Sequence, residues 1–315
     1  MLNIVFLDAD TLGMVDLSPI AEQGALMVYA NSGTLDVAER IKSCDIVVTN
    51  HVTLRSATLE RQRNLKLIVT TEANLPNIDV EWAEQNKIRI VSLNGYAVES
   101  VAQSTMAAML YLSCKLRYFD QSVKSGAYSR SHSFTDSSQN FFDIRGKYWG
   151  IIGMGHVGER VAEMASILGM KVIYYPLKGE EPSKYDAVNL DVLMKKSDIL
   201  SVHAPANSHT INLITTKQMK LMKPTACVLN YGGAGIINEN DLVQCLNDYT
   251  ISGAASDTYT QEPIPYNHPY TQVNDPDKIL LTPHVAWASY ESRLALVSHI
   301  AKAIKEFKAE ATAKH

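Results

Sequence analysis

Short apolar runs alternate with amphipathic segments along the first third of the chain. Each run holds three to five mostly aliphatic residues, which is typical of strands buried on both faces. The segments between them, such as residues 35–41 and 80–85, carry apolar residues at helical spacing. This alternation predicts parallel strands joined by helices in a doubly wound sheet. The strands expected here are residues 4–7, 26–29, 46–49, 67–69 and 88–91.

A second alternating series follows a polar interruption. One long helical pattern covers about 97–122, and the serine-rich stretch 125–140 behind it is interpreted as a loop or arm. The next series predicts a second sheet of the Rossmann kind, and an amphipathic helix at 289–309 is expected to return to the first lobe. The strands expected in the second series are residues 150–152, 172–175, 199–202, 227–230, 251–254 and 279–281.

The length of the chain fits this division. Its 315 residues suit two α/β domains of about 150 residues each better than one core. The predicted fold is therefore α/β, with two doubly wound parallel-sheet, Rossmann-like domains and a cleft between them. A flavodoxin-like substrate domain would comprise residues 1–97 and 287–315, and residues 98–286 would form the dinucleotide-binding domain.

Composition narrows the function to small-molecule chemistry. The charged fraction is 20% and the formal net charge is -4, so no basic field attracts nucleic acid or anionic lipid. We expect no membrane span and no secretory signal, since no run reaches about 18 apolar residues and the N-terminus enters a strand at once. The four cysteines lie far apart, which predicts reduced thiols, no metal site and a cytoplasmic location.

A glycine-rich turn predicts the cofactor. The run Gly153-Met154-Gly155-His156-Val157-Gly158 follows the apolar strand 149–152 and opens the helical run 161–168. The first glycine permits a tight turn, the second lets backbone approach a pyrophosphate, and the third allows close helix packing. The helix N-terminus presents free N–H groups to the anion. The residues expected to bind NAD or NADP here are Gly153, Gly155, His156, Val157 and Gly158.

The second half of that dinucleotide fingerprint is absent. A carboxylate about 20 residues after the turn should bind the ribose hydroxyls, but the strand 171–175 ends in Tyr175. Glu180 and Glu181 stand later in the chain than the fingerprint requires. Because Lys178 is close by, the sequence leaves both NAD and NADP open, with NAD favoured.

Two segments near the C-terminus suggest acid–base chemistry. His284 follows an expected strand end, where a histidine can give a proton to a carbonyl or take one from an alcohol. A carboxylate partner would orient the ring and favour its charged form. The alternative for His284 taken singly is a hydrogen-bonded structural histidine.

Several of these motifs, in this order, resemble the D-isomer-specific 2-hydroxyacid dehydrogenases. The segment 283–289 is most similar to the glycerate dehydrogenase (hydroxypyruvate reductase) branch of that family. The likeness extends over nearly the whole chain. The matching segments are residues 4–8, 100–103, 153–158, 201–205, 222–224, 257–263 and 281–289.

The resemblance implies an NAD(P)-dependent oxidoreductase for a small 2-hydroxy or 2-keto acid such as glycerate or hydroxypyruvate. His284 would be its proton donor and Glu262 the partner of that histidine. It also implies a homodimer in which the long helix and the 125–140 arm embrace the other subunit. The cofactor contacts expected from the resemblance and from the turn's surroundings are Tyr175, His203, Pro205, Asn230 and Asp257.

The chain departs from the family pattern at the expected substrate anchor. The family's catalytic arginine follows the strand that ends at Asn230, and here Gly233 takes its place. A guanidinium binds a carboxylate through paired, charge-assisted bonds, which a glycine cannot supply. The carboxylate-binding loop also differs, since the small pair usual in the family is replaced within 72–77, where Asn74 and Leu75 are the expected substrate contacts.

These departures leave two hypotheses. The first is an active dehydrogenase, with low activity or an altered substrate, in which His51 or Arg293 could stand in for the missing cation. The ordinary roles of those two residues are a surface histidine and a salt-bridged arginine. The second is a catalytically degenerate dinucleotide-binding protein that acts as a sensor or interaction partner. Tyr231, beside the missing arginine, either fills the vacated volume or faces solvent.

Overall fold

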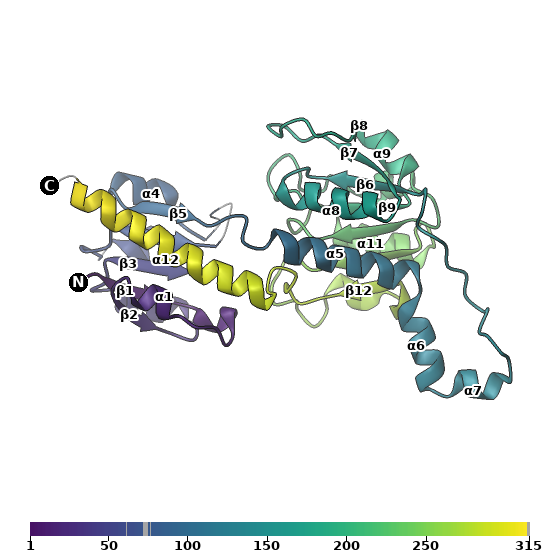
Figure 1. Cartoon of the computed structure of the whole chain (residues 1–315), viewed down its shortest axis with the longest axis horizontal. Helices are drawn as coiled ribbons and strands as arrows, with labels where there is room; N and C mark the ends of the chain where they lie inside the picture. The colour runs from purple at the N-terminus through teal and green to yellow at the C-terminus, as the bar shows by residue number, and fades with distance from the viewer. Residues whose placement is uncertain (61, 72–74, 76, 314–315) are drawn as a thin grey trace. The chain divides into compact units, whose positions relative to one another are not determined.

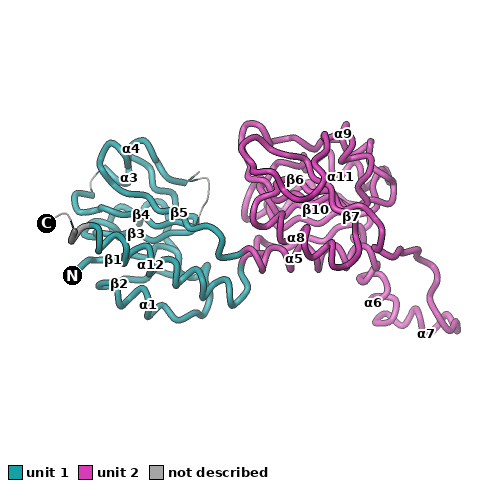
Figure 2. Tube along the Cα trace, turned by 45° about the horizontal axis from the view of Figure 1, so that its top comes forward, with its two compact units in different colours: residues 1–97, 288–315 teal, residues 98–287 magenta. Residues whose placement is uncertain are grey.

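The computed structural model describes residues 1–60, 62–71, 75 and 77–313. The chain divides into two compact units, Met1–Ala97 with Ala288–His315, and Val98–Trp287 (Figure 2). The sequence placed these transitions at 97/98 and 286/287, and in the structure the second one falls at 287/288. Each unit is built on one parallel sheet, so the predicted α/β fold with two doubly wound sheets is confirmed.

The first unit is built on a five-stranded sheet. Its order, β2-β1-β3-β4-β5, is that of flavodoxin-like folds. Strands β3 and β4 are buried along their whole length, as their unbroken aliphatic runs predicted. The strands are β1 (Asn3–Phe6), β2 (Ala25–Val28), β3 (Ile46–Thr49), β4 (Leu67–Thr70) and β5 (Arg89–Ser92). The helices are η1 (Ala9–Leu12), α1 (Ser18–Ala21), α2 (Thr34–Arg40), α3 (Ser56–Leu59), α4 (Val80–Gln85) and α12 (Tyr290–Ala313).

The second unit is built on a seven-stranded parallel sheet in the order β12-β11-β10-β9-β6-β7-β8. Strands β6 to β11 have the Rossmann order, in which β7 and β8 are added on one side of the first strand β6 and the later strands on its other side. The short strand β8 was not predicted, and β11 begins two residues later than expected. The strands are β6 (Tyr148–Ile152), β7 (Lys171–Tyr175), β8 (Asp186–Ala187), β9 (Ile199–Val202), β10 (Cys227–Asn230), β11 (Gly253–Ser256) and β12 (Ile279–Leu281).

Alternate residues of the central strand β6 enter two different cores. Trp149 and Ile151 pack on the face covered by α5 (Val98–Ser113) and α8 (His156–Ile167), while Ile152 packs on the other face (Figure 1). This period of two is what a strand buried on both faces requires. The remaining helices are α6 (Leu116–Lys124), α7 (Ala127–Ser131), α9 (Leu190–Lys196), α10 (Thr216–Met219), α11 (Glu239–Asn247), η2 (Pro269–Gln272) and η3 (Pro276–Lys278).

The prediction of one long helix over 97–122 is wrong, because this segment forms the two helices α5 and α6. Lys115 adopts a left-handed conformation, with φ of 52°, between α5 and α6, and this ends the first hydrogen-bond ladder. Helices α6 and α7, with the loop that follows them, then leave the body of the second unit as an arm (Figure 1). Val123 and Phe134 on this arm are 61% and 98% exposed, so the arm carries uncovered apolar surface.

Candidate active site

The candidate residues of the second unit lie at the carboxyl ends of its parallel strands. Backbone hydrogen bonds tie the connections that follow these strands to their neighbours. The N–H of His203 donates to Ile152, that of Asp257 to Asn230, and that of Thr282 to Ser256. Parallel strands bring all their carboxyl ends to one edge of the sheet, which is where α/β folds bind ligands.

The glycine-rich turn has the geometry that a dinucleotide needs. Gly153 has φ of 92°, and a Cβ there would lie 2.4 Å from the backbone nitrogen of Ala204. A Cβ at Gly158 would lie 2.1 Å from the carbonyl oxygen of Gly153, so helix α8 packs directly on the turn. At Gly155, by contrast, a Cβ would meet nothing within 4 Å. Two glycines therefore hold the turn closed, and the middle one leaves room for a phosphate.

The N-terminus of α8 completes this anion site. Gly155 is its N-cap and offers no side-chain acceptor, and His156 begins the helix. The N–H groups of His156 and Val157 have no carbonyl within the helix to bond, and they carry the positive end of the helix dipole. The residues present therefore fit the pyrophosphate of a dinucleotide.

A carboxylate does reach this turn, contrary to expectation. Glu180 accepts the N–H of Met154 at 2.9 Å and the N–H of Leu177 at 2.9 Å. The chain after β7 turns back on itself, with Gly179 at φ of 90°, and so returns Glu180 to the end of the strand. The distance along the chain suggested that Glu180 was too far from the glycine-rich turn. The fold brings it close because the chain reverses between β7 and this residue.

Tyr175 and His203 flank the turn. Tyr175 is partly buried and packs against the hydrophobic core on one face of the sheet. His203 Nε2 lies 3.0 Å from Ser201 Oγ, which accepts the indole N–H of Trp149 at 2.8 Å. Burial lowers the pKa of His203 to about 3, so the ring is neutral at physiological pH. Pro205, in the next loop, is exposed.

The low pKa of His203 has a measurable consequence for stability. Below about pH 6.5 the unfolded chain protonates this histidine while the folded protein does not, so acidification favours unfolding. Between pH 7 and pH 5, we expect the unfolding free energy of wild type to fall by about 2 kcal/mol more than that of the variant His203→Asn, which lacks the histidine. Denaturant titrations of both proteins at both pH values measure the two free energies. If their difference is the same at pH 7 and pH 5, His203 does not have a lowered pKa in the folded protein.

The segment around Gly233, where the resemblance placed the family's arginine, is enclosed by neighbouring backbone. Asn230 is 2% exposed; its Nδ2 donates to the carbonyl of Gly233 at 3.3 Å, and its Oδ1 accepts the N–H of Gly232 at 3.3 Å. A Cβ at Gly233 would lie 2.2 Å from the backbone nitrogen of Ala206. No side chain fits at Gly233 unless one of these two loops moves.

Tyr231 does not face solvent. It is 8% exposed and packs in the core that also contains Met154 and Ala286. Burial raises the pKa of its hydroxyl to about 12. The question that the sequence left open is therefore answered in favour of a core tyrosine.

His284 and Glu262 form a close pair. His284 Nδ1 lies 2.6 Å from Glu262 Oε2, and the two side chains are 37% and 33% exposed. The other oxygen of Glu262 accepts the N–H of Tyr259 at 2.9 Å. The imidazole is thus held through one nitrogen by an oriented carboxylate, which is the arrangement required of a positioned acid or base.

The loop that carries His284 is held by a buried carboxylate. Asp257 is 2% exposed and accepts the Thr282 hydroxyl at 2.6 Å and the N–H groups of Val285 and Ala286 at 3.0 and 2.9 Å. Burial raises the pKa of this carboxyl. His284 has φ of 53°, a strained value for a residue with a side chain. Asp257 therefore holds the loop that imposes this conformation, and its expected contact with the nicotinamide stays a prediction.

A second buried pair supports Glu262 from behind, and sequence reasoning missed it. Glu239 accepts the N–H of Thr260 at 2.8 Å and its hydroxyl at 2.6 Å, and lies 3.3 Å from His268 Nε2. Glu239 and His268 are 9% and 2% exposed. In sequence, Glu239 is indistinguishable from an ordinary acidic residue in the first turn of a helix, so no pattern signals this contact. Together they anchor the turn that carries Glu262.

The remaining predicted contacts belong to the first unit. Asn74 lies outside the described residues. Leu75 is partly buried and packs against that unit's core. The backbone N–H of His51 donates to Asp8, and Arg293 donates to the carbonyl of Leu12 at 2.7 Å. Arg293 is therefore a structural donor in this unit.

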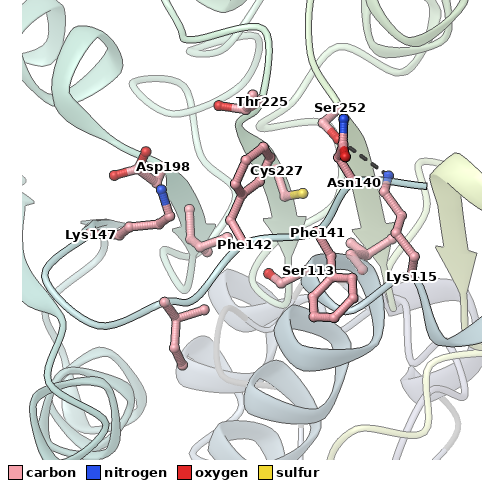
Figure 3. Close-up of a pocket in the computed structure, with 13 residues that line it drawn as sticks. Ser113, Lys115, Asn140, Phe141, Phe142, Lys147, Asp198, Thr225, Cys227 and Ser252 are labelled. Atoms are coloured by element: carbon pink, nitrogen blue, oxygen red, sulfur yellow. Dashed lines mark hydrogen bonds between the residues drawn. The ribbon is translucent and has the colours of Figure 1, made fainter. Parts of the chain in front are cut away.

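A small cavity lies at the opposite edge of the second sheet. It has a volume of about 50 Å³ and lies at the amino ends of β9 and β10, between Phe142 and Cys227 (Figure 3). Lys115 Nζ donates to Ser252 Oγ at 3.4 Å in its wall. Because the glycine-rich turn and His284 lie at the carboxyl ends of the strands, this cavity is separate from the candidate site.

The part of the chain that the structure describes contains neither a candidate metal site nor a membrane span. Among these residues, no group of three or more histidine, cysteine, aspartate or glutamate side chains is placed to hold a metal ion. Within the same residues, no helix is both long and apolar enough to cross a membrane. The four cysteines are free thiols.

Comparison with known proteins gives consistent results. Residues 106–286 match the family model described as D-isomer specific 2-hydroxyacid dehydrogenase, NAD binding domain. The chain is 31% identical to a glycerate dehydrogenase of Methylorubrum extorquens over 86% of this chain and 85% of that protein. It is 28% identical to a hydroxypyruvate reductase of Blautia hydrogenotrophica over 97% of each. An acyclic imino acid reductase, solved with NADPH and D-Arg, has a TM-score of 0.87 at 27% identity, covering 98% of this chain and 97% of that one.

Proposed function

Because this chain belongs to the D-isomer-specific 2-hydroxyacid dehydrogenases, and is therefore an oxidoreductase with an NAD-binding domain, we propose that it reduces a small 2-keto acid such as hydroxypyruvate or glyoxylate. The observation that carries this proposal is the 2.6 Å contact between His284 Nδ1 and Glu262 Oε2. The names of its relatives, a glycerate dehydrogenase and a hydroxypyruvate reductase, support the substrate class.

The pair has a defined part in this reaction. When bound, the reduced dinucleotide supplies the hydride that adds to the carbonyl carbon. His284 gives the proton that the new alkoxide oxygen takes up, using the ring nitrogen that does not contact Glu262. Glu262 fixes the ring orientation and stabilises the imidazolium that precedes proton transfer. Oxidation of the 2-hydroxy acid uses the same groups in reverse.

We infer that the substrate carboxylate is bound differently from the family pattern. Gly233 provides no guanidinium, and the backbone around it leaves no space for a side chain. Loss of one preorganised donor typically lowers a rate by about 100- to 1,000-fold. Reduction of an ordinary 2-keto acid is therefore expected to be slow unless groups elsewhere bind the carboxylate.

The test is a substrate panel with purified protein. We expect NADH oxidation with hydroxypyruvate to exceed that with glyoxylate or pyruvate, because the names of the relatives, a glycerate dehydrogenase and a hydroxypyruvate reductase, indicate a hydroxylated three-carbon acid. Absorbance at the NADH band measures the rates. Tight NADH binding without turnover on any acid would instead support the catalytically degenerate alternative.

A second candidate is reduction of an imino acid, which the absence of a side chain at Gly233 favours. A protonated imine carries its own positive charge, so its carbon needs no neighbouring cation to accept hydride. The acyclic imino acid reductase that this structure resembles supports this alternative. In the same panel, turnover of a keto acid only when a primary amine is added would identify it.

We also propose a homodimer and a cytoplasmic location. The arm formed by α6, α7 and the loop after them exposes Val123 and Phe134, and a second copy of the chain is the partner that would cover them. The four free thiols support a reducing compartment.

A further inference from the structure

Glu180 is a carboxylate held directly against the dinucleotide turn. Its two oxygens accept the N–H of Met154, inside the glycine-rich run, and the N–H of Leu177, just beyond β7. Both contacts are 2.9 Å, and the side chain is partly buried. One carboxylate thus bridges the end of β6 to the end of β7.

That location is where a dinucleotide fold needs an acid. The sheet register pairs Ile152 with Tyr175, so the ends of β6 and β7 are neighbours. In the common fingerprint, a carboxylate at the end of the second strand binds the ribose hydroxyls of the adenosine. Here that strand ends in a tyrosine, and the chain between β7 and β8 brings Glu180 back to the same point.

The bonds that Glu180 already makes leave it able to bind a ligand. An ionised carboxylate has about four acceptor positions, and two N–H groups occupy two of them. The remaining lone pairs can accept from hydroxyl groups, and a phosphate in the same place would meet a like charge.

We propose that Glu180 selects NAD(H) over NADP(H) by binding the adenosine ribose hydroxyls in place of the missing side chain at the end of β7. The proposal rests on dinucleotide binding at Gly153–Gly158 but does not depend on the substrate or on turnover. Lys178, whose proximity left NADP open in the sequence, is exposed on the same segment between β7 and β8.

The alternative is that Glu180 only stabilises the turn. In that case its removal would alter the affinities for both dinucleotides by the same factor, because both share the pyrophosphate site. A ribose ligand instead changes the ratio of the two affinities.

Binding measurements on the intact protein separate these cases. Fluorescence titration gives the Kd of NADH and of NADPH for wild type, Glu180→Gln, Glu180→Ala and the control Glu181→Gln, which changes an exposed neighbouring carboxylate. Wild type should prefer NADH. Both Glu180 variants should lose about 10- to 100-fold of NADH affinity, with NADPH binding equal or tighter, while the control matches wild type.

Three results would overturn the proposal. They are a wild type that prefers NADPH, a wild type that binds neither dinucleotide, and Glu180 variants with an unchanged ratio of the two affinities. Thermal unfolding of each variant without dinucleotide shows whether the turn remains folded. Absence of catalytic activity would refute the proposed reaction without altering these affinities, so the two failures are distinguishable.

Discussion

Replacing His284 with glutamine is expected to lower kcat for keto-acid reduction by about 10²- to 10⁴-fold, because the positioned proton donor is lost. Glutamine retains a polar side chain of similar reach but has no proton to transfer at neutral pH. The affinity for NADH should stay unchanged, since the glycine-rich turn is untouched. Steady-state kinetics and fluorescence titration measure the two quantities separately.

Two further variants make this result specific. His209→Gln changes an exposed histidine on the loop after β9 and should leave kcat unchanged. Glu262→Gln keeps an acceptor for the ring of His284 but removes the charge, so an intermediate loss is expected. If His284→Gln retains most of the wild-type kcat, proton transfer does not depend on this residue and the proposed mechanism fails.

A pair of glycine substitutions should separate stability from cofactor binding. Gly233→Ala places a methyl group 2.2 Å from the backbone nitrogen of Ala206, so we expect a loss of about 1 to 3 kcal/mol of unfolding free energy. At Gly155, the N-cap of α8, the methyl group of an alanine meets no neighbour within 4 Å, so only the smaller cost of a poorer N-cap residue is expected. The same methyl group faces the expected phosphate, so a similar steric cost would weaken NADH binding by about 5- to 150-fold.

Denaturant unfolding and NADH titration on both variants provide the comparison, and each variant serves as the control for the other. The idea is contradicted if Gly155→Ala binds NADH as tightly as wild type, or if Gly233→Ala is as stable as wild type. The crowding at Gly233 also means that Gly233→Arg cannot simply restore a guanidinium, because the loop at Ala206 must move first.

The parts of the fold that depend on local pattern were predictable. Aliphatic runs identified nearly all the parallel strands, and the glycine spacing identified the turn together with its helix. His284 and Glu262 were expected as a pair, and the structure brings them into contact. The turn was identified by glycines at fixed distances from a strand end, whereas the pairing of Glu262 with His284 was implied by the resemblance to the family.

What sequence could not give depends on chain reversal and packing. Glu180 reaches the turn because residues after β7 fold back, and Lys115 ends a helix through its backbone conformation. Tyr231 could equally have faced solvent, and only the packing around it placed it in the core. None of these outcomes follows from periodicity, because each is decided by contacts between distant segments.

The buried pair of Glu239 and His268 links the turn that carries Glu262 to helix α11. The conformation of this turn therefore depends on residues outside it. An engineer who grafts it into a related enzyme to change substrate preference would have to transplant the acid of α11 and the histidine before η2 as well. Otherwise the graft would carry the glutamate without the scaffold that aims it.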